Sequence, residues 1–578
     1  MWSVLLMYEK EFIGGHIFDG SIANLKFAYD ALTRTDTGNE FVKTPIENGE
    51  ILISEEPFSK EKYFLRVNEI KYGGNAAWAL EMAREHNYFE KNRDLSDEHE
   101  NPDEPFRAQR EEQRFNIAEC EILGVSRESG FYSARTPISV FSRVRKLVPE
   151  DFNGPLQQTM GDLKIGHLRS GSQVLNLEAG IFKKALSTHT FITARTGGGK
   201  SNTMKVLNGV MLETKGEVSP LIFEPHGEYI QDLKRHPLQK ERLVIYNQDG
   251  RDGDNKIKIA YKRITVDSLM NIRRQMRWTE PQERFMTEAQ AVLKDNWFQV
   301  LVETPYDEEE YFIMNGKPFE DDDLGGLQEF VTHLGKGSGS KPKLLRDIFR
   351  GGAHVDTIKA TKSKLQRLAR STFLVADEKQ DDMEFLIGHL LNGKGVLVDM
   401  ASLSGLQELF LSSLLTSEVL ERQKELYKKD RKGFEEGKYP TIAIVLEECQ
   451  RVLGKGEDSE GNVFRSVVNE GRKFLLSLIG ITQQAKLMDP VVLSQMNTHI
   501  ILGISDETDF DLLKGRVQKS IKNLELDINQ LMPGEAIIST PYSPFALPIK
   551  IFEYNQYIEN LKRKLPSSTN SPNLSLFA

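Results

Sequence analysis

Cysteine is almost absent from this sequence: the 578 residues include only Cys120 and Cys449. Two cysteines cannot build the disulfide framework that stabilises small secreted domains, so we expect a protein of a reducing compartment, the cytoplasm. Long apolar runs are absent as well. None approaches the ~18 consecutive apolar residues of a membrane-spanning helix, and the apolar start is broken at Glu9 and Lys10, too early for a signal peptide. We therefore expect no membrane attachment.

An excess of basic residues is also lacking. The 75 lysines and arginines are outnumbered by 85 aspartates and glutamates, for a formal net charge of −10. This balance argues against a protein held on nucleic acid by bulk positive charge, but it leaves room for a basic channel in an acidic body. Apolar residues are plentiful, because 39% of the chain is hydrophobic, which is enough for the cores of several domains.

The first 160 residues have the pattern of β structure. Runs with partial alternation of apolar and polar residues cover Tyr63–Tyr72, Phe115–Leu123 and Pro137–Val148. Several short strands separated by turns are typical of a small barrel. We therefore predict an N-terminal β-barrel over residues 1–160.

The pattern changes after residue 160, where continuous apolar strands begin to alternate with helices. This alternation, over residues 161–265 and 391–555, is typical of an α/β fold with a parallel sheet. Residues 266–390 show helical patterns without strand signals and are predicted to be an inserted helical subdomain, and residues 556–578 a C-terminal tail. The predicted buried strands are Thr190–Ala194, Ser219–Phe223, Arg242–Tyr246, Gly395–Val398, Thr441–Leu446, Leu475–Ile481 and His499–Leu502.

A glycine-rich loop follows the first of these strands. The run Ala194-Arg-Thr-Gly-Gly-Gly-Lys-Ser201 fits the pattern G-x-x-x-x-G-K-[ST] between a strand and a helix, with Ala194 at the first glycine position. Backbone N–H groups of such a loop surround phosphate oxygens, while Lys200 would reach the β- and γ-phosphates and the Ser201 hydroxyl would ligate Mg²⁺. The predicted nucleotide-binding residues are Thr196, Gly197, Gly198, Gly199, Lys200, Ser201 and Asn202.

Two carboxylates follow the apolar strand Thr441–Leu446. In a nucleotide hydrolase the first, Glu447, would hold a Mg²⁺-bound water, and the second, Glu448, would act as general base on the water that attacks the γ-phosphate. Side chains of adjacent strand residues point to opposite sides, but the chain turns at the end of a strand, so both can face the site.

Other polar groups follow other predicted strands. Thr482 and Gln483 come after Leu475–Ile481, and Glu224-Pro-His-Gly-Glu228 comes after Ser219–Phe223. Because ligands of open α/β sheets bind beyond the carboxyl ends of the strands, we expect these segments to converge on one edge. Arg472 precedes its strand, so it is expected at the opposite edge, where it would reach the nucleotide of a neighbouring subunit instead of its own.

Taken together, these motifs resemble the HerA family of DNA translocases. The resemblance rests on the phosphate loop with His189 before its strand, the Glu-Pro-His-Gly-Glu-Tyr segment, Glu447–Glu448, Glu-Gly-Arg-Lys, and Ile-Thr-Gln-Gln followed by Leu-Ser-Gln-Met-Asn-Thr. These occur in the order of the family between Ile165 and Ile551. Two departures are Ala194 in the phosphate loop and Cys449-Gln450 where the family often has Ala-His.

The resemblance implies a RecA-like P-loop ATPase core, an N-terminal barrel, and a homo-hexameric ring that moves double-stranded DNA with ATP and Mg²⁺. It also implies that Glu448 is the catalytic base, Gln483 a sensor and Arg472 a trans arginine finger. Relatives work with a partner protein, either a NurA-like or other nuclease in DNA-end processing, or a nuclease or sirtuin-like NAD-degrading effector in anti-phage defence.

Two further functions stay open beside the DNA motor. In one, the ATP site chiefly stabilises a hexameric scaffold that assembles and activates an effector with little motor activity. In the other, the ring moves protein or peptide, as related ring ATPases of secretion systems do. If duplex DNA runs through a channel, candidate contacts are Lys256, Lys258, Lys359, Lys362, Lys364, Arg367 and Arg370.

Overall fold

The computed structural model describes residues 12–30, 32–34, 41–43, 46–72, 115–140, 142–152, 154–251, 254–315, 344–349, 352–456, 462–504 and 506–564. The chain divides into two compact units. Unit 1 comprises Met1–Ala185, Thr193–Thr203 and Asn497–Glu553, and unit 2 comprises Leu186–Ile192, Met204–Met496 and Tyr554–Ala578. These two units do not test the domain boundaries expected from the sequence, which stay predictions.

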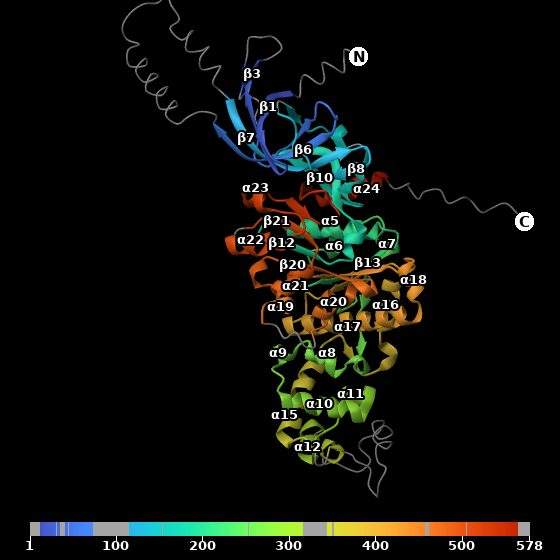
Figure 1. The fold of residues 1–578 in the computed structure, drawn as a ribbon. Helices are drawn as coiled ribbons and strands as arrows, with labels where there is room; N and C mark the ends of the chain where they lie inside the picture. The colour runs from blue at the N-terminus through green and yellow to red at the C-terminus, as the bar shows by residue number, and fades with distance from the viewer. Residues whose placement is uncertain are drawn as a thin grey trace, which may run out of the picture. The chain divides into compact units, whose positions relative to one another are not determined.

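Unit 1 contains the expected barrel (Figure 1). Its sheet has the order β2-β1-β9-β5-β6-β7-β8, and a further pairing of β2 with β7 closes it. Apolar side chains such as Phe27, Leu65 and Ala118 are buried inside. The strands are β1 (Phe12–Gly20), β2 (Asn24–Asp30), β5 (Ile51–Glu55), β6 (Lys62–Tyr72), β7 (Phe115–Arg127), β8 (Gly130–Tyr132) and β9 (Arg143–Lys146).

The predicted strand at Pro137–Val148 is mostly wrong in its bounds. Only Arg143–Lys146 is a strand, and residues 137–139 have no regular secondary structure. The apolar residues in that run do not share a face, because Ile138 and Val144 are buried whereas Val140 is 56% exposed. Apolar content alone therefore overextended the strand.

A second, antiparallel group of strands in unit 1 escaped sequence analysis. Its order is β11-β10-β23-β22-β21, formed by β10 (Leu163–Ser170), β11 (Gln173–Ile181), β23 (Leu547–Ile551), β22 (Glu535–Ser539) and β21 (Thr498–Leu502). β21, predicted as a buried strand, lies between β22 and β12 in the order, and its pairing with β22 is antiparallel.

Buried charges join the C-terminal strands to the rest of unit 1. The guanidinium group of Arg66, in β6, donates a hydrogen bond of 2.5 Å to the carbonyl of Ala546. Arg169, in β10, forms an ion pair of 2.6 Å with Asp527, and both side chains are buried. Because a buried charge without a partner is costly, these pairs constrain where residues 497–553 can lie within the unit.

Unit 2 contains the expected parallel strands. The order runs from β20 (Leu476–Thr482) through β19 (Thr441–Leu446), β13 (Val218–Glu224) and β18 (Gly395–Asp399) to β14 (Leu243–Asn247). Each neighbouring pair in this run is parallel. β12 (Thr190–Ala194) precedes β20 in the order, and the chain passes from unit 2 to unit 1 within it. The strands are buried on both faces, which explains their continuous apolar runs.

Helices of unit 2 cover this sheet and form the expected insertion. α16 (Met383–Leu391) contacts β13 and β18, and α20 (Val463–Glu470) contacts β20 and the long helix α17 (Gly405–Lys429). In the insertion, α10 (Glu280–Leu293), α11 (Trp297–Glu303) and α15 (Val355–Ala369) pack together around the buried side chains of Phe285, Trp297 and Leu365. One short strand, β17 (Leu374–Val375), interrupts the predicted all-helical stretch and pairs with β16 (Ile259–Ala260).

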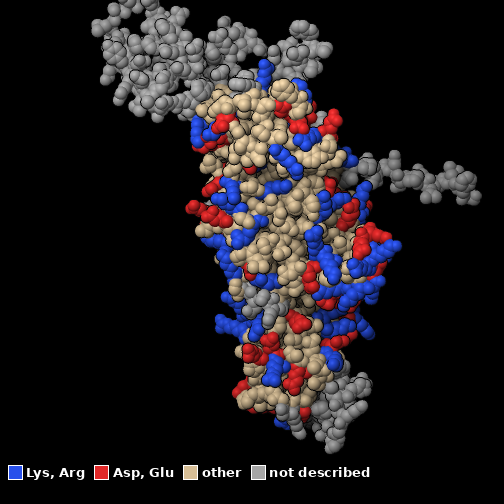
Figure 2. Space-filling model, viewed as in Figure 1, with Lys and Arg blue, Asp and Glu red and all other residues tan. Residues whose placement is uncertain are grey.

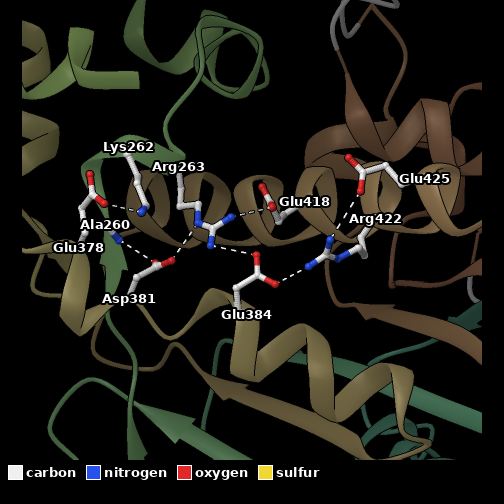
Figure 3. Close-up of polar contacts among 9 residues, drawn as sticks. All are labelled: Ala260, Lys262, Arg263, Glu378, Asp381, Glu384, Glu418, Arg422 and Glu425. Atoms are coloured by element: carbon white, nitrogen blue, oxygen red, sulfur yellow. Dashed lines mark hydrogen bonds and ion pairs between the residues drawn. The ribbon is translucent and has the colours of Figure 1, made fainter. Parts of the chain in front are cut away.

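The insertion is fastened at its base by one arginine (Figure 3). Arg263 donates to Asp381 at 2.8 Å, to Glu384 at 3.1 Å and to Glu418 of α17 at 3.1 Å. Glu384 also pairs with Arg422. One side chain therefore links the segment that enters the insertion, the segment that leaves it, and a core helix.

Candidate nucleotide-hydrolysis site

The phosphate loop lies in unit 1, directly after β12. Gly197 and Gly199 have φ values of +76° and +97°, a backbone conformation that favours glycine. Gly198 is required for space, because a Cβ there would lie 2.5 Å from the carbonyl oxygen of Leu502. Ala194 is the last residue of β12 and is not among the residues with positive φ, so that position does not need a glycine.

The loop leads into the helix α5 (Lys200–Leu212). Lys200 and Ser201 occupy its first two positions, and the N-terminal end of a helix favours an anion because of the helix dipole. The side-chain amide of Asn202 donates a hydrogen bond of 2.8 Å to the carbonyl of Phe552. Asn202 therefore connects the start of α5 to the residue that follows β23.

The paired carboxylates lie in unit 2, at the carboxyl end of β19. Glu447 is buried, with 7% of its surface exposed, and Glu448 is half-buried. Glu448 has a φ of +48°, so the chain turns sharply between the two residues. A left-handed conformation is unfavourable for glutamate by roughly 1–3 kcal/mol, and such strain is concentrated at functional sites. The side-chain amide of Gln450 donates a hydrogen bond of 2.5 Å to Oε2 of Glu448.

A third carboxylate, Glu224, was not among the predicted site residues. It ends β13, the strand directly beside β19, and its side chain is fully buried. Oε1 accepts a hydrogen bond of 2.9 Å from the backbone of His226, whereas Oε2 has no hydrogen-bond partner. Burial, with smaller contributions from the charges of Glu447 and Glu228, raises the pKa of Glu224 to about 7. The signal in the sequence was the same as for Glu447: a carboxylate directly after a buried strand.

The sensor candidate follows the third strand of this group. β20 lies beside β19, and Gln483 comes directly after it, with its side chain exposed. Thr482 is buried and its hydroxyl accepts a hydrogen bond of 2.9 Å from the backbone of Gln484, which shapes the turn. The structure therefore brings Glu224, Glu447–Glu448 and Gln483 to the carboxyl ends of three adjacent parallel strands.

Arg472 lies at the other end of β20, as predicted. It belongs to the short turn η7 (Gly471–Phe474), which precedes the strand, and its side chain is exposed. Within unit 2 it is therefore separated from the carboxylates by the length of a strand.

Most of the proposed DNA contacts on α15 have partners inside unit 2. Lys362 is 2% exposed. Its ammonium group donates a hydrogen bond of 2.7 Å to the carbonyl of Thr304 and forms an ion pair of 2.6 Å with Glu310. Lys359 forms an ion pair of 3.0 Å with Asp307, and Lys364 donates a hydrogen bond of 2.7 Å to the carbonyl of Arg277. These lysines hold the insertion together. The sequence of the insertion also contains an acidic run at residues 320–323, which lies outside the described residues.

The surface charges are mixed. On the face drawn in Figure 2, basic and acidic side chains lie interspersed over both units. Such a surface fits the formal net charge of −10.

The donor chemistry of each unit suits magnesium. Ser201 of unit 1 has a hydroxyl oxygen and Glu447 of unit 2 a carboxylate oxygen, the kinds of ligand that Mg²⁺ prefers. In the described part of the chain, no group of three or more His, Cys, Asp or Glu residues could hold a metal ion. Among the described helices, none is both long and apolar enough to cross a membrane.

Comparison with known proteins agrees with these motifs. A family model described as the central domain of helicase HerA matches residues 163–419. A probable DNA double-strand break repair helicase HerA of Methanocaldococcus jannaschii is 24% identical over 73% of this chain and 82% of that protein. The DNA double-strand break repair helicase HerA of Sulfolobus acidocaldarius is 29% identical over 65% of this chain and 66% of that protein. Over residues 163–419 the chain is therefore similar to the central domain of HerA helicases, and it is a P-loop ATPase.

The match to the HerA central domain runs from β10 into α17. Among solved structures, the bacterial conjugative coupling protein TrwBΔN70 matches 69% of this chain and 91% of its own, with 13% identity and a TM-score of 0.44. VirB4 of Thermoanaerobacter pseudethanolicus matches with 16% identity and a TM-score of 0.41, over 68% of this chain and 96% of its own.

Proposed function

We propose that this HerA-family protein is an ATP-driven translocase of double-stranded DNA that works as a homo-hexameric ring. The observation that carries the proposal is the row of Glu224, Glu447–Glu448 and Gln483 at three adjacent parallel strand ends, with Arg472 at the opposite end of β20. A hydrolase that needs an arginine from its neighbour has this separation of groups within one chain.

Each residue has a proposed role. Thr196 to Asn202 bind the phosphates of ATP, and Ser201 and Glu447 hold Mg²⁺, which neutralises phosphate charge when bound. Glu448 accepts a proton from the attacking water, and Gln483 contacts the γ-phosphate or that water. Arg472 reaches the nucleotide of the adjacent subunit, where an arginine finger contributes a factor of about 10³–10⁵ in rate.

The biological setting follows from the relatives. Two curated relatives are named as DNA double-strand break repair helicases, so duplex DNA is the proposed substrate. A partner nuclease of the NurA kind in DNA-end processing, or a nuclease or sirtuin-like NAD-degrading effector in anti-phage defence, would use the ring as its motor. A cytoplasmic setting is part of this proposal.

One observation favours a second function, an ATP-binding hexameric scaffold that activates an effector. The side-chain amide of Gln450 donates a hydrogen bond of 2.5 Å to Oε2 of Glu448, the proposed base. If this contact persists with ATP bound, hydrolysis would be slow and the ring itself would be the signal.

Ring formation and DNA binding test both functions before any effector is known. Glu448→Gln protein with ATP and Mg²⁺ is expected to sediment as a hexamer and to bind duplexes of unrelated sequence with an affinity that falls as salt rises. Lys200→Ala protein is the matched control that cannot hold the phosphates. A hexamer without affinity for DNA would leave only the scaffold, and a monomer under both conditions would refute both functions.

A further inference from the structure

His189 is a buried histidine that the proposed mechanism does not use. It lies one residue before β12, the strand that leads to the phosphate loop, and is 3% exposed. Its φ is +59°, an unfavourable conformation for a residue with a Cβ. Such a conformation persists only where the contacts around the residue hold it in place.

Those contacts join two elements. Nδ1 of His189 accepts a hydrogen bond of 3.0 Å from the backbone amide of Leu478, in β20. The imidazole also hydrogen-bonds the backbone of Val468, in the last turns of α20. Because Nδ1 is an acceptor, the proton is on Nε2, which donates to the Val468 carbonyl.

Arg472 lies between these two anchor points in the chain. Val468 precedes the η7 turn by three residues, and Leu478 follows it by four. The turn itself is tightly defined: a Cβ on Gly471 would lie 2.6 Å from the carbonyl oxygen of Leu476, and Leu475 has a φ of +52°. Both flanks of the arginine turn are therefore held by one imidazole.

We propose that His189 is a positioning residue for Arg472, which fixes the arginine-bearing turn relative to the strand that enters the phosphate loop of the same subunit. This inference rests on the proposed trans role of Arg472. Because His189 directly precedes β12, its hydrogen bonds couple the position of Arg472 to the position of β12. A shift of β12 on nucleotide binding would therefore move the turn that presents Arg472 to the neighbouring subunit.

The electrostatics of the pair agree with a neutral imidazole. Burial, with a smaller contribution from the charge of Arg472, lowers the pKa of His189 to about 4. A protonated ring has no acceptor and would lose the bond from Leu478 while repelling Arg472. The groups that meet the ring are thus the Leu478 amide, the Val468 carbonyl and the Arg472 charge. The amide and the charge favour the neutral ring, and the carbonyl places its proton on Nε2.

The variants follow from these two bonds. His189→Ala removes both. His189→Asn tolerates the left-handed backbone and keeps an acceptor close to the position of Nδ1, so it should retain part of the function and fold where alanine does not. His236→Ala is the matched control, because His236 is also 3% exposed in unit 2 and its Nδ1 also accepts a backbone amide, that of Leu238 at 3.2 Å.

Single-variant kinetics separate positioning from stability. We expect His189→Ala to lower kcat for ATP at least tenfold while KM changes less than twofold, because the phosphate loop is intact. His189→Asn should recover part of kcat, and His236→Ala should keep kcat near wild type at temperatures where the protein is folded. Equal losses of kcat in His189→Ala and His236→Ala would reduce His189 to a structural residue and overturn the proposal.

Mixed rings then identify which side of the interface is damaged. The reference mixture is Lys200→Ala with Arg472→Ala, in which some interfaces pair an intact phosphate loop with an intact arginine. If it recovers turnover, the trans role holds, and His189→Ala should be rescued by Lys200→Ala subunits but not by Arg472→Ala subunits. The reverse pattern would place the His189 defect in its own phosphate loop and overturn the proposal. If the reference mixture itself stays inactive in confirmed mixed rings, the trans role fails, and the inference about His189 fails with it.

Discussion

The side-chain amide of Gln450 donates a hydrogen bond of 2.5 Å to Oε2 of Glu448. Gln450 follows Glu448 by two residues, and the backbone of Glu448 between β19 and Gln450 is left-handed, with a φ of +48°. The amide thus fixes one oxygen of the proposed base, and Oε1 remains to take a proton from water. The departure from the family at Cys449-Gln450 therefore keeps a polar partner for the base.

Replacing Gln450 tests whether this contact supports or restrains hydrolysis. We expect Gln450→Ala to lower kcat about tenfold, because losing a hydrogen bond to a charged group costs about 1.5–3 kcal/mol and leaves the base less oriented. Gln450→His, which restores the residue often found in the family, should retain most of the activity. Steady-state ATP hydrolysis measures both, and a rise in turnover in Gln450→Ala would favour the scaffold.

Glu447 is expected to set the magnesium requirement. In Glu447→Ala the ion would lose its carboxylate support, so the Mg²⁺ concentration for half-maximal turnover should rise at least tenfold. Titration of turnover with Mg²⁺ at saturating ATP provides the measurement. Asp399, at the end of β18, is a control carboxylate, and Asp399→Ala should leave the titration unchanged. An unchanged titration in Glu447→Ala would refute the assignment.

Glu224 predicts a pH-dependent stability. Its pKa is raised from 4.5 to about 7 in the folded chain, so the folded state binds the proton more tightly than the unfolded state. The contribution of Glu224 to stability is therefore highest below pH 4.5 and falls as the pH rises toward 7, by about 3 kcal/mol in all.

The variant Glu224→Gln removes this titration. Without nucleotide or Mg²⁺, its melting temperature relative to wild type should be higher at pH 8 than at pH 5. Glu217→Gln is the control, because Glu217 is exposed and precedes the same strand, β13. A difference in melting temperature that does not depend on pH would contradict the raised pKa of Glu224.

Sequence patterns predicted the strands that are continuously apolar and the polar residues that directly follow them. The parallel strands of unit 2 appeared as continuous apolar runs because they are buried on both faces, and Glu447, Glu448 and Gln483 were found because they follow such runs. The strands β10, β11, β22 and β23 were missed because they alternate or are short.

Partners distant in the chain were also beyond sequence analysis. Lys359, Lys362 and Lys364 resembled a basic helix face, and only the fold shows that they bind Asp307, Glu310 and backbone carbonyls. His189 was noticed as part of a motif, but its bonds to Leu478 and Val468 join residues almost 300 positions apart.

Steady-state ATP hydrolysis by the purified protein, with and without linear duplex DNA, tests the central claim most directly. The account predicts turnover that duplex of any sequence stimulates severalfold, that added salt weakens, and that Glu448→Gln lowers by a factor of about 10²–10⁴. Slow hydrolysis that does not respond to DNA would contradict a motor, and wild-type turnover in Glu448→Gln would contradict the assignment of the base.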